Sequence, residues 1–162
     1  MVSNFACHNV GFISTRFNGT DGVSLEANKW AAVLNEMGRR CFYFSGKSDK
    51  PAEQSKVVPE AFFQYPEIEQ IHNLAFDGIG LEDYLEAPDS RAEVVLPRHA
   101  AVFLTRPRAI TNRIHEIKEY LKEEIYSFVR DFAIDLLIVE NALSIPLNIP
   151  LGIAITEFIA ET

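Results

Sequence analysis

The sequence has few cysteines and no long apolar run. Only Cys7 and Cys41 occur among its 162 residues, which is too few for a disulfide framework, and each lies in or beside an apolar segment. No stretch reaches the roughly 18 uninterrupted apolar residues that a membrane-spanning helix needs. Residues 1–8 lack the basic region and the apolar core of a secretory signal. We therefore expect a cytoplasmic protein with reduced thiols and no membrane span.

Basic residues are also scarce. Lys and Arg together number 15 against 23 Asp and Glu, which gives a formal net charge of -8. Most of the surface should therefore repel a phosphate backbone, so nucleic acid is excluded as a general partner. The contents of 48% hydrophobic and 23% charged residues are ordinary for a globular protein. The length predicts one domain over residues 1–162.

The amino-terminal third begins with a strand and a helix. Asn9–Thr15 is short, apolar and partly β-branched, as in a buried strand that leaves a sheet. Apolar residues then recur every three or four positions over residues 23–37, which indicates an amphipathic helix. Either Thr20 or Asp21 can cap the start of this helix, and Gly38 can end it.

A second short strand at residues 41–45 completes a strand–helix–strand unit, whose crossover is right-handed in nearly every known case. Five prolines then divide residues 47–104 into short pieces. Pro66 predicts the start of a short helix. Four apolar residues of that helix are expected to point inward: Ile68, Ile71, Leu74 and Phe76. Three apolar stretches in the same region suggest short strands: Val57–Val58, Phe62–Phe63 and Ala101–Leu104.

The apolar pattern in the last third of the chain predicts a long helix, then a strand, then a second helix. Arg106–Phe132 carries seven large apolar residues on one face and charged residues opposite. Asp135–Val139 is continuously apolar after its first residue, which is typical of a parallel strand buried on both faces. A further helix should begin near Asn148. Alternating strands and helices predict an α/β fold of the Rossmann-like kind, an open parallel sheet with helices on both faces.

Open parallel sheets bind ligands beyond the carboxyl ends of their strands, near the point where the strand order reverses. Two polar clusters follow predicted strands and are candidates for one site. The first is the loop Asn18–Ser24, whose free N–H groups beside a helix start could hold a phosphate. The alternative is that Gly19 and Gly22 only make a tight turn. The second cluster contains three polar residues: Glu140, Asn141 and Ser144.

Glu140 ends a buried strand beside the predicted cleft, which suggests a role in a site. An ion pair or a helix cap explains the residue equally well. A dinucleotide fingerprint would need G-x-G-x-x-G and an acidic residue after the second strand, where Ser45 and Gly46 stand instead. NAD binding is therefore disfavoured. No His or Cys spacing fits a metal site either, so neither a cofactor nor a metal is expected.

Two segments resemble the amino-terminal half of glycosyltransferases with the GT-B fold, in group 1 or family 4. Phe12–Glu26, with the sequence FISTRFNGTDGVSLE, is similar to the first strand, glycine loop and helix start of that family. Val139–Asn148, with the sequence VENALSIPLN, is similar to the acceptor-side loop of a subgroup. The resemblance covers both ends of the chain.

The resemblance implies retaining transfer of a sugar from a nucleotide-sugar donor to an acceptor, in a cleft between two Rossmann-like halves. This half would hold the acceptor and bring Gly19–Gly22 near the donor diphosphate. Eight residues would then bind substrate: Gly19, Thr20, Asp21, Gly22, Val23, Glu140, Asn141 and Ser144. The family's paired-glutamate motif belongs to the donor half. The pair Glu116 and Glu124 lacks its glycine and proline context, so no catalytic residue is assigned.

The same resemblance implies that the chain is an incomplete amino-terminal half, inactive alone. Apolar surface that later elements would cover favours association, so we expect homo-oligomers. The alternative is a non-catalytic binding or assembly module of flavodoxin-like shape. That alternative predicts self-association through residues 149–159 and no activity that depends on Glu140.

Overall fold

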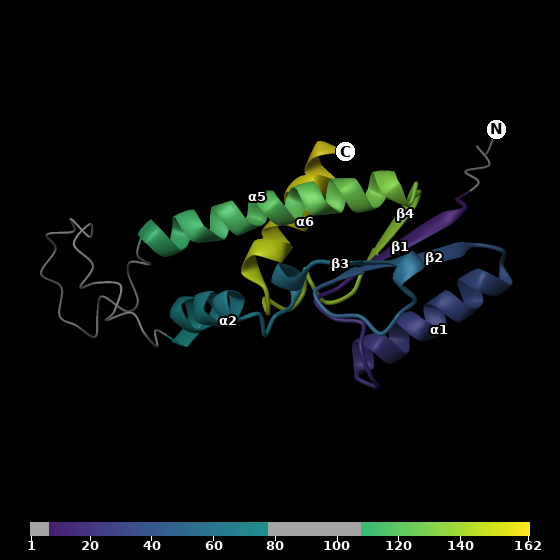
Figure 1. The fold of residues 1–162 in the computed structure, drawn as a ribbon, viewed down its shortest axis with the longest axis horizontal. Coiled ribbons are helices and arrows are strands. Elements are labelled where there is room, and N and C mark those ends of the chain that lie inside the picture. Colours follow the sequence, from purple (N-terminus) through teal and green to yellow (C-terminus); the bar gives the residue numbers. More distant parts are fainter. Residues whose placement is uncertain (1–6, 78–107) are drawn as a thin grey trace, which may run out of the picture.

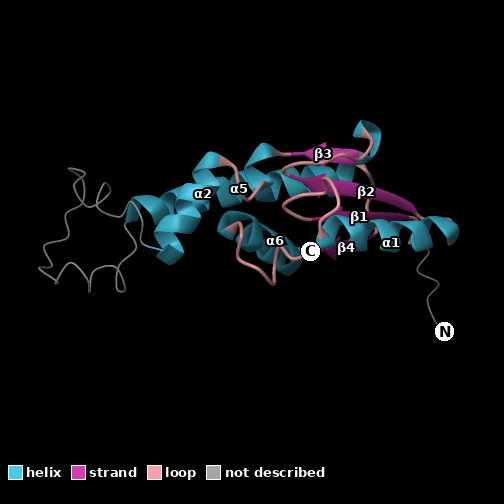
Figure 2. Cartoon of the chain, turned by 90° about the horizontal axis from the view of Figure 1, so that it is seen from below, coloured by secondary structure: helices cyan, strands magenta, loops and turns pink. Residues whose placement is uncertain are grey.

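The computed structural model describes residues 7–77 and 108–162. Its sheet has four parallel strands in the order β3-β2-β1-β4 (Figure 2). The strands are β1 (Asn9–Ile13), β2 (Arg40–Ser45), β3 (Ser55–Val57) and β4 (Leu136–Val139). The α-helices are α1 (Gly22–Glu36), α2 (Pro66–His72), α5 (Arg108–Asp131) and α6 (Ile149–Glu161). Three short helical turns complete the described part: η1 (Ala52–Gln54), η2 (Pro59–Ala61) and η3 (Asn73–Asp77).

Helices cover both faces of the sheet, so the predicted open α/β architecture is confirmed. α1 lies on one face, and α5 and α6 lie on the other (Figure 1). All five residues of β1 are buried because successive side chains enter the two cores alternately. Val10 and Phe12 pack toward α1, and Ile13 joins the larger core under α5 and α6.

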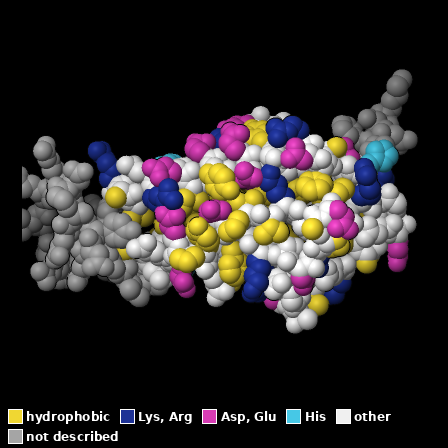
Figure 3. All heavy atoms as spheres, viewed as in Figure 1, with side chains coloured by type: hydrophobic (Ala, Val, Ile, Leu, Met, Phe, Trp, Pro, Cys, Tyr) yellow, Lys and Arg dark blue, Asp and Glu magenta, His cyan; other side chains and the backbone are white. Residues whose placement is uncertain are grey.

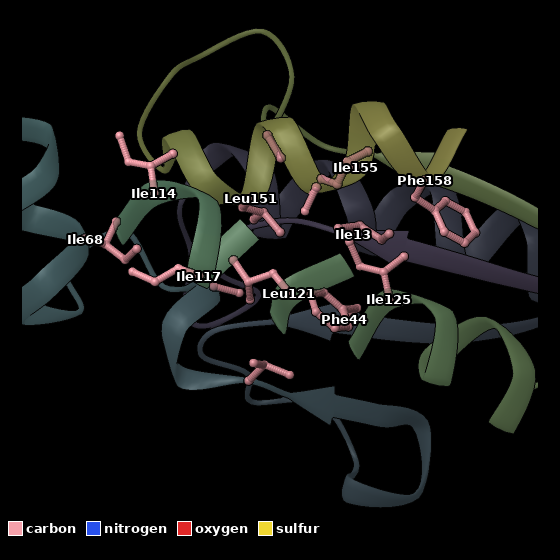
Figure 4. Packing of buried hydrophobic residues seen from close by; sticks show 14 of the residues in the cluster. Ile13, Phe44, Ile68, Ile114, Ile117, Leu121, Ile125, Leu151, Ile155 and Phe158 are labelled. Carbon is pink, nitrogen blue, oxygen red and sulfur yellow. The ribbon is translucent and has the colours of Figure 1, made fainter. Parts of the chain in front are cut away.

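The larger core explains why α5 and α6 form. Apolar residues of both helices, spaced three or four apart, point at one another and at the sheet (Figure 4). Leu121 and Ile125 of α5 and Leu151 and Ile155 of α6 are fully buried. The outer face of α5 carries acidic and basic side chains close together (Figure 3). Most apolar residues of α6 pack inside the chain, whereas Ile159 near its end is 53% exposed.

The capping predictions are confirmed at α1. The Asp21 carboxylate accepts hydrogen bonds from the N–H groups of Val23 and Ser24, so Asp21 and not Thr20 is the cap. Gly38 follows the helix with φ of 74°, a left-handed conformation that glycine adopts without strain. Trp30 and Met37 share the apolar period of α1 but are more than half exposed. The apolar stripe of α1 is wider than the face that the sheet covers.

Two predictions in the middle of the chain are wrong. Phe76 is exposed because the π-helical turn η3 inserts an extra residue and rotates Phe76 away from Ile68 and Ile71. Phe62–Phe63 is not a strand, since the 3-10 turn that begins at Pro59 ends there, with Phe62 N–H donating to the Pro59 carbonyl. β3 includes Val57 but not Val58. The predicted strand Ala101–Leu104 lies outside the described residues, as do the first two positions of the long helix predicted from Arg106.

Candidate functional site

The carboxyl ends of β1 and β4 form the point where the strand order reverses. From β1 the chain moves to β2 on one side, and it later returns to β4 on the other side of β1. The Glu140 N–H donates to the Ile13 carbonyl at 2.8 Å, so the turn after β4 is hydrogen-bonded to the end of β1. The loop 14–21 leaves β1 at the same edge. The two sequence-predicted clusters therefore lie at the same carboxyl edge of the sheet, where such sheets bind ligands.

Two carboxylates hold the loop after β1. Gly19 adopts φ of 87°, and its N–H donates to an Asp49 carboxylate oxygen at 2.8 Å. The Asp21 carboxylate caps α1 and also forms an ion pair with Arg16 at 3.1 Å. Partial burial works against ionisation of Asp21, but hydrogen bonds from Ser24 and the Arg16 guanidinium hold its pKa below the ordinary value. The protein's own carboxylates thus occupy the N–H groups of Gly19, Val23 and Ser24.

The middle of the loop remains open to a ligand. Within the described residues, the N–H groups of Thr20, Asp21 and Gly22 make no hydrogen bond. A Cβ atom added at Gly22 would have no heavy atom within 4 Å. Three consecutive N–H groups at the start of a 15-residue helix suit an anionic group, because the helix end carries partial positive charge.

Three cationic side chains lie over aromatic rings at the same edge of the sheet. Arg16 lies 5.5 Å from the centroid of the Phe63 ring. Lys47 lies 5.8 Å from that of Phe62, and Lys50 lies 5.7 Å from that of Tyr43. Arg16 is also paired with Asp21 at 3.1 Å, and Lys50 with Asp49 at 3.3 Å. Among the described residues, Lys47 is the cation of this group that no carboxylate neutralises, and its contact with Phe62 holds it next to the loop after β1.

Sequence reasoning did not find these cations. The Phe17 N–H donates to the Lys47 carbonyl at 2.8 Å, and Phe17 pairs with Ser48 in an isolated parallel bridge. These two contacts join the segment after β2 to the loop after β1. The only signal for these cations in the sequence was that basic and aromatic residues occur near one another, but the pairs that come into contact belong to distant segments.

The turn after β4 presents polar groups to solvent. Asn141 adopts φ of 61°, a left-handed conformation that Asn tolerates better than most residues. Its carbonyl accepts from the N–H groups of Ser144 and Ile145 at 3.2 and 2.9 Å, and Asn141 and Ser144 are both exposed. Glu140 is partly buried. In the described part of the chain it makes neither an ion pair nor a capping hydrogen bond, so neither structural alternative for Glu140 is observed.

Glu140 has a raised pKa because of its partial burial, and the charge of Glu26 on α1 adds to the effect. A carboxyl group with a raised pKa in the folded state stabilises the protein only while it is protonated, and this contribution is lost as the pH rises through its folded-state pKa. We expect Glu140→Gln to leave stability unchanged at pH 3.5 and to increase it at pH 7, by less than about 1 kcal/mol. Urea unfolding at both pH values measures the difference. An equal effect at both would contradict this electrostatic account.

An apolar hollow of about 290 Å³ lies beside this turn, against the outer side of α6. Leu143 and Pro146 of the turn and Ile149 and Ile153 of α6 line it. Its polar lining residues bind other parts of the protein. They are Asn148, which caps α6, Thr156, which donates to the Gly152 carbonyl, and Glu157, which accepts from Lys118 and Lys122. The hollow therefore suits an apolar group.

Comparison with known proteins finds no matching family model, curated protein or solved structure. Across residues 7–77 and 108–162, no three His, Cys, Asp or Glu side chains are grouped so that they could hold a metal ion. No helix in this part of the chain has the length and apolar character needed to cross a bilayer. The candidate site thus consists of the loop after β1, the three cations and the turn after β4.

Proposed function

We propose that this chain is the acceptor-side half of a retaining glycosyltransferase with the GT-B fold, which uses a nucleotide-sugar donor. The observation that carries the proposal is that the loop after β1 and the turn after β4 leave the same carboxyl edge of the sheet, where the strand order reverses. These are the two segments that resemble the glycosyltransferase family. An open parallel sheet with helices on both faces is also the architecture that an incomplete amino-terminal GT-B half would have.

The polar groups at the carboxyl edge of the sheet support separate roles for the two segments, one in donor binding and one in acceptor binding. The open N–H groups of Thr20, Asp21 and Gly22, with Arg16 and Lys47 nearby, are suited to the donor diphosphate. The exposed amide of Asn141, the hydroxyl of Ser144 and the Glu140 carboxyl can hydrogen-bond the hydroxyl groups of a sugar acceptor. No side chain is assigned to the transfer step itself, because in this proposal the donor-binding half completes the active site.

Two experiments test this proposal. Calorimetric titration of the chain with UDP, GDP and their sugar conjugates should show weak binding that requires the diphosphate, with uridine and guanosine as negative controls. Turnover should be absent with the chain alone and should occur when a donor-binding half is supplied, from sequence beyond residue 162 or from a separate polypeptide. Equal binding of nucleosides and diphosphates, or no turnover in any such combination, would contradict the proposal.

Gly22→Ala separates ligand binding from folding. The new methyl group meets open space in the protein, so the free energy of unfolding should change by less than about 0.5 kcal/mol. The methyl would nevertheless stand where a diphosphate approaches the backbone, and we expect UDP affinity to fall about tenfold or more. Glu36→Ala, at the exposed far end of α1, is the matched control and should leave the affinity unchanged. Unchanged UDP affinity in Gly22→Ala would place the diphosphate elsewhere.

One observation favours the alternative, a non-catalytic binding module. Asp21 already places a carboxylate at the start of α1, where many phosphate-binding helices receive their ligand. The two functions differ in what Glu140 does. If the chain takes part in sugar transfer, Glu140→Ala should lower turnover by the completed enzyme, whereas a binding module predicts no change.

A further inference from the structure

Helix α6 carries apolar residues on two opposite sides. Leu151 and Ile155 are fully buried and point into the larger core (Figure 4). Ile149 and Ile153 are only partly buried, and at 3.6 residues per turn they lie roughly 160° around the helix axis from the first pair. A helix that is apolar all round is normally buried all round. The second side of α6 is therefore the unusual one, and it is this side that lines the apolar hollow.

The hollow lies between α6 and the turn after β4 and measures about 290 Å³. Leu143 and Pro146 line it from the turn. Gly152 lines it from α6, and a Cβ atom added there would lie 3.2 Å from the Ala142 carbonyl oxygen, so the turn approaches the helix closely at this point. At about 30 Å³ for each water-sized group, the hollow has room for roughly ten such groups. A short alkyl chain or a single ring has this size.

The charge in the lining of the hollow is already neutralised. Glu157 is the only charged residue among the described residues that line it. Both oxygens of its carboxylate accept from Lys118, at 3.0 and 2.9 Å, and one also accepts from Lys122 at 3.0 Å. A charged ligand group would lose its water here without gaining a partner. The hollow therefore suits an uncharged group.

The turn after β4 places free polar groups beside the hollow. Asn141 directly precedes Ala142, and Ser144 directly follows Leu143, two residues that line it. The Asn141 side chain makes no hydrogen bond to the part of the chain that the structure describes. The Ser144 hydroxyl contacts only the Asn141 carbonyl, at 3.5 Å. These amide and hydroxyl groups are thus available to the hydroxyl groups of a ligand.

We propose that the hollow binds the apolar part of a neutral acceptor, an alkyl or aryl glycoside whose sugar hydroxyl groups bind Asn141 and Ser144. Its role as an acceptor rests on the proposed glycosyltransferase function, whereas binding of the glycoside requires neither a donor nor a donor-binding half. A sugar alone leaves the apolar lining in water, and an alcohol alone leaves the two polar side chains in water. The ligand that carries both parts binds best.

A series of alkyl β-glucosides tests the proposal. Calorimetric titration of the full chain uses methyl, butyl, hexyl and octyl glucoside, without nucleotide and below the concentrations at which they form micelles. Affinity should rise by up to about fourfold for each added methylene until the chain fills the hollow. Hexanol and methyl glucoside should each bind at least about tenfold more weakly than hexyl glucoside. Affinity that does not depend on chain length, or equal affinity for hexanol and hexyl glucoside, would overturn the proposal.

Two substitutions on α6 locate the binding site. Thr156 lines the hollow and is exposed, so Thr156→Phe should fill the space while the protein stays folded. We expect the affinity for hexyl glucoside to fall about tenfold or more. Ala160→Phe is the matched control, because Ala160 is exposed on the same helix and is not among the described residues that line the hollow. Equal affinities of the two variants would overturn the proposal.

Two substitutions in the turn separate the two parts of the ligand. Leu143→Ser removes an apolar wall at a half-exposed residue and should lower the affinity for hexyl glucoside about fivefold or more, with no change for methyl glucoside. Asn141→Gly removes the amide but keeps the backbone, since glycine adopts a φ of 61° without strain. It should weaken binding of hexyl glucoside and not of hexanol. The opposite pattern in either variant would overturn the assignment.

The glucoside and UDP titrations have independent outcomes. UDP binding without any dependence on glucoside chain length would overturn this inference alone. Glucoside binding without UDP binding would contradict the proposed donor site alone. Once a donor-binding half is supplied, hexyl glucoside should be a better acceptor than methyl glucoside. Equal turnover of the two glucosides would overturn the role of the hollow in acceptor choice.

Discussion

Gly46→Ala is expected to destabilise the protein by about 3 kcal/mol or more. Gly46 follows β2, and a Cβ atom there would overlap the backbone N and Cα of Phe62. The obstacle is main chain, which cannot rotate away as a side chain can. The Gly46 N–H also donates to the Thr15 carbonyl at 3.1 Å, so the glycine itself cannot retreat without losing a bond to the segment after β1.

The same substitution should weaken ligand binding, because Phe62 holds Lys47 at the candidate site. Urea unfolding measures the stability loss, and UDP titration of the folded fraction measures the binding loss. Gly11→Ala is an informative comparison: its nearest neighbours are side-chain atoms of Phe128 at 2.8 Å and Ile134 at 3.0 Å, which can shift. We expect it to cost less than Gly46→Ala. The reverse order would contradict the close approach of residues 46 and 62.

Asn9→Ala should cost about 2 kcal/mol, since it removes three partly buried hydrogen bonds. The Asn9 amide donates to the carbonyls of Phe132 and Ala133 at 2.9 and 3.0 Å and thereby satisfies backbone groups just after α5. Its side-chain oxygen accepts from Arg40 at 2.9 Å. The residue is 4% exposed, so water cannot easily replace these bonds.

Asn35→Ala is the control for this prediction, because Asn35 is exposed on α1 and should change stability by less than about 0.5 kcal/mol. Thermal or urea unfolding of both variants provides the comparison. Asn9 lies at the amino edge of the sheet, opposite the candidate site, so UDP affinity of folded Asn9→Ala should match that of the unmodified protein. Equal stabilities of the two asparagine variants would contradict the account.

Elements with strong local signals could be predicted from the sequence. β4 was found because residues 136–139 are continuously apolar, but it is the edge strand of the described sheet and no residue of it is fully buried, so burial on both faces was a wrong prediction. The end of α1 was found because Gly38 supplies a left-handed residue. Which residues of a helix are buried was harder to predict. Trp30 and Met37 share a period with Ala27 and Ala31, which are buried. Periodicity shows which residues share a side, but it does not show how much of that side a neighbouring element covers.

Contacts between distant segments could not be predicted. Nothing near Asn9 in the sequence indicates that it bonds to residues after α5, more than 120 positions away. The cations of the candidate site likewise depend on the fold, since Arg16 rests on Phe63 only after the chain has formed two further strands. The loop after β1 was predicted as a whole, but the carboxylates that occupy part of its N–H groups depend on side-chain geometry.

The central claim is that the carboxyl edge of the sheet, which both the loop after β1 and the turn after β4 leave, binds a nucleotide-sugar. A titration of the ¹⁵N-labelled chain with UDP-glucose and GDP-mannose, followed by two-dimensional NMR, tests it most directly. We predict saturable shifts of the amide resonances of Gly19–Ser24, Lys47 and Lys50 with at least one of them, which Gly22→Ala weakens. No shifts with either donor, or the largest shifts at the opposite edge around Asn9 and Asp135, would contradict the claim.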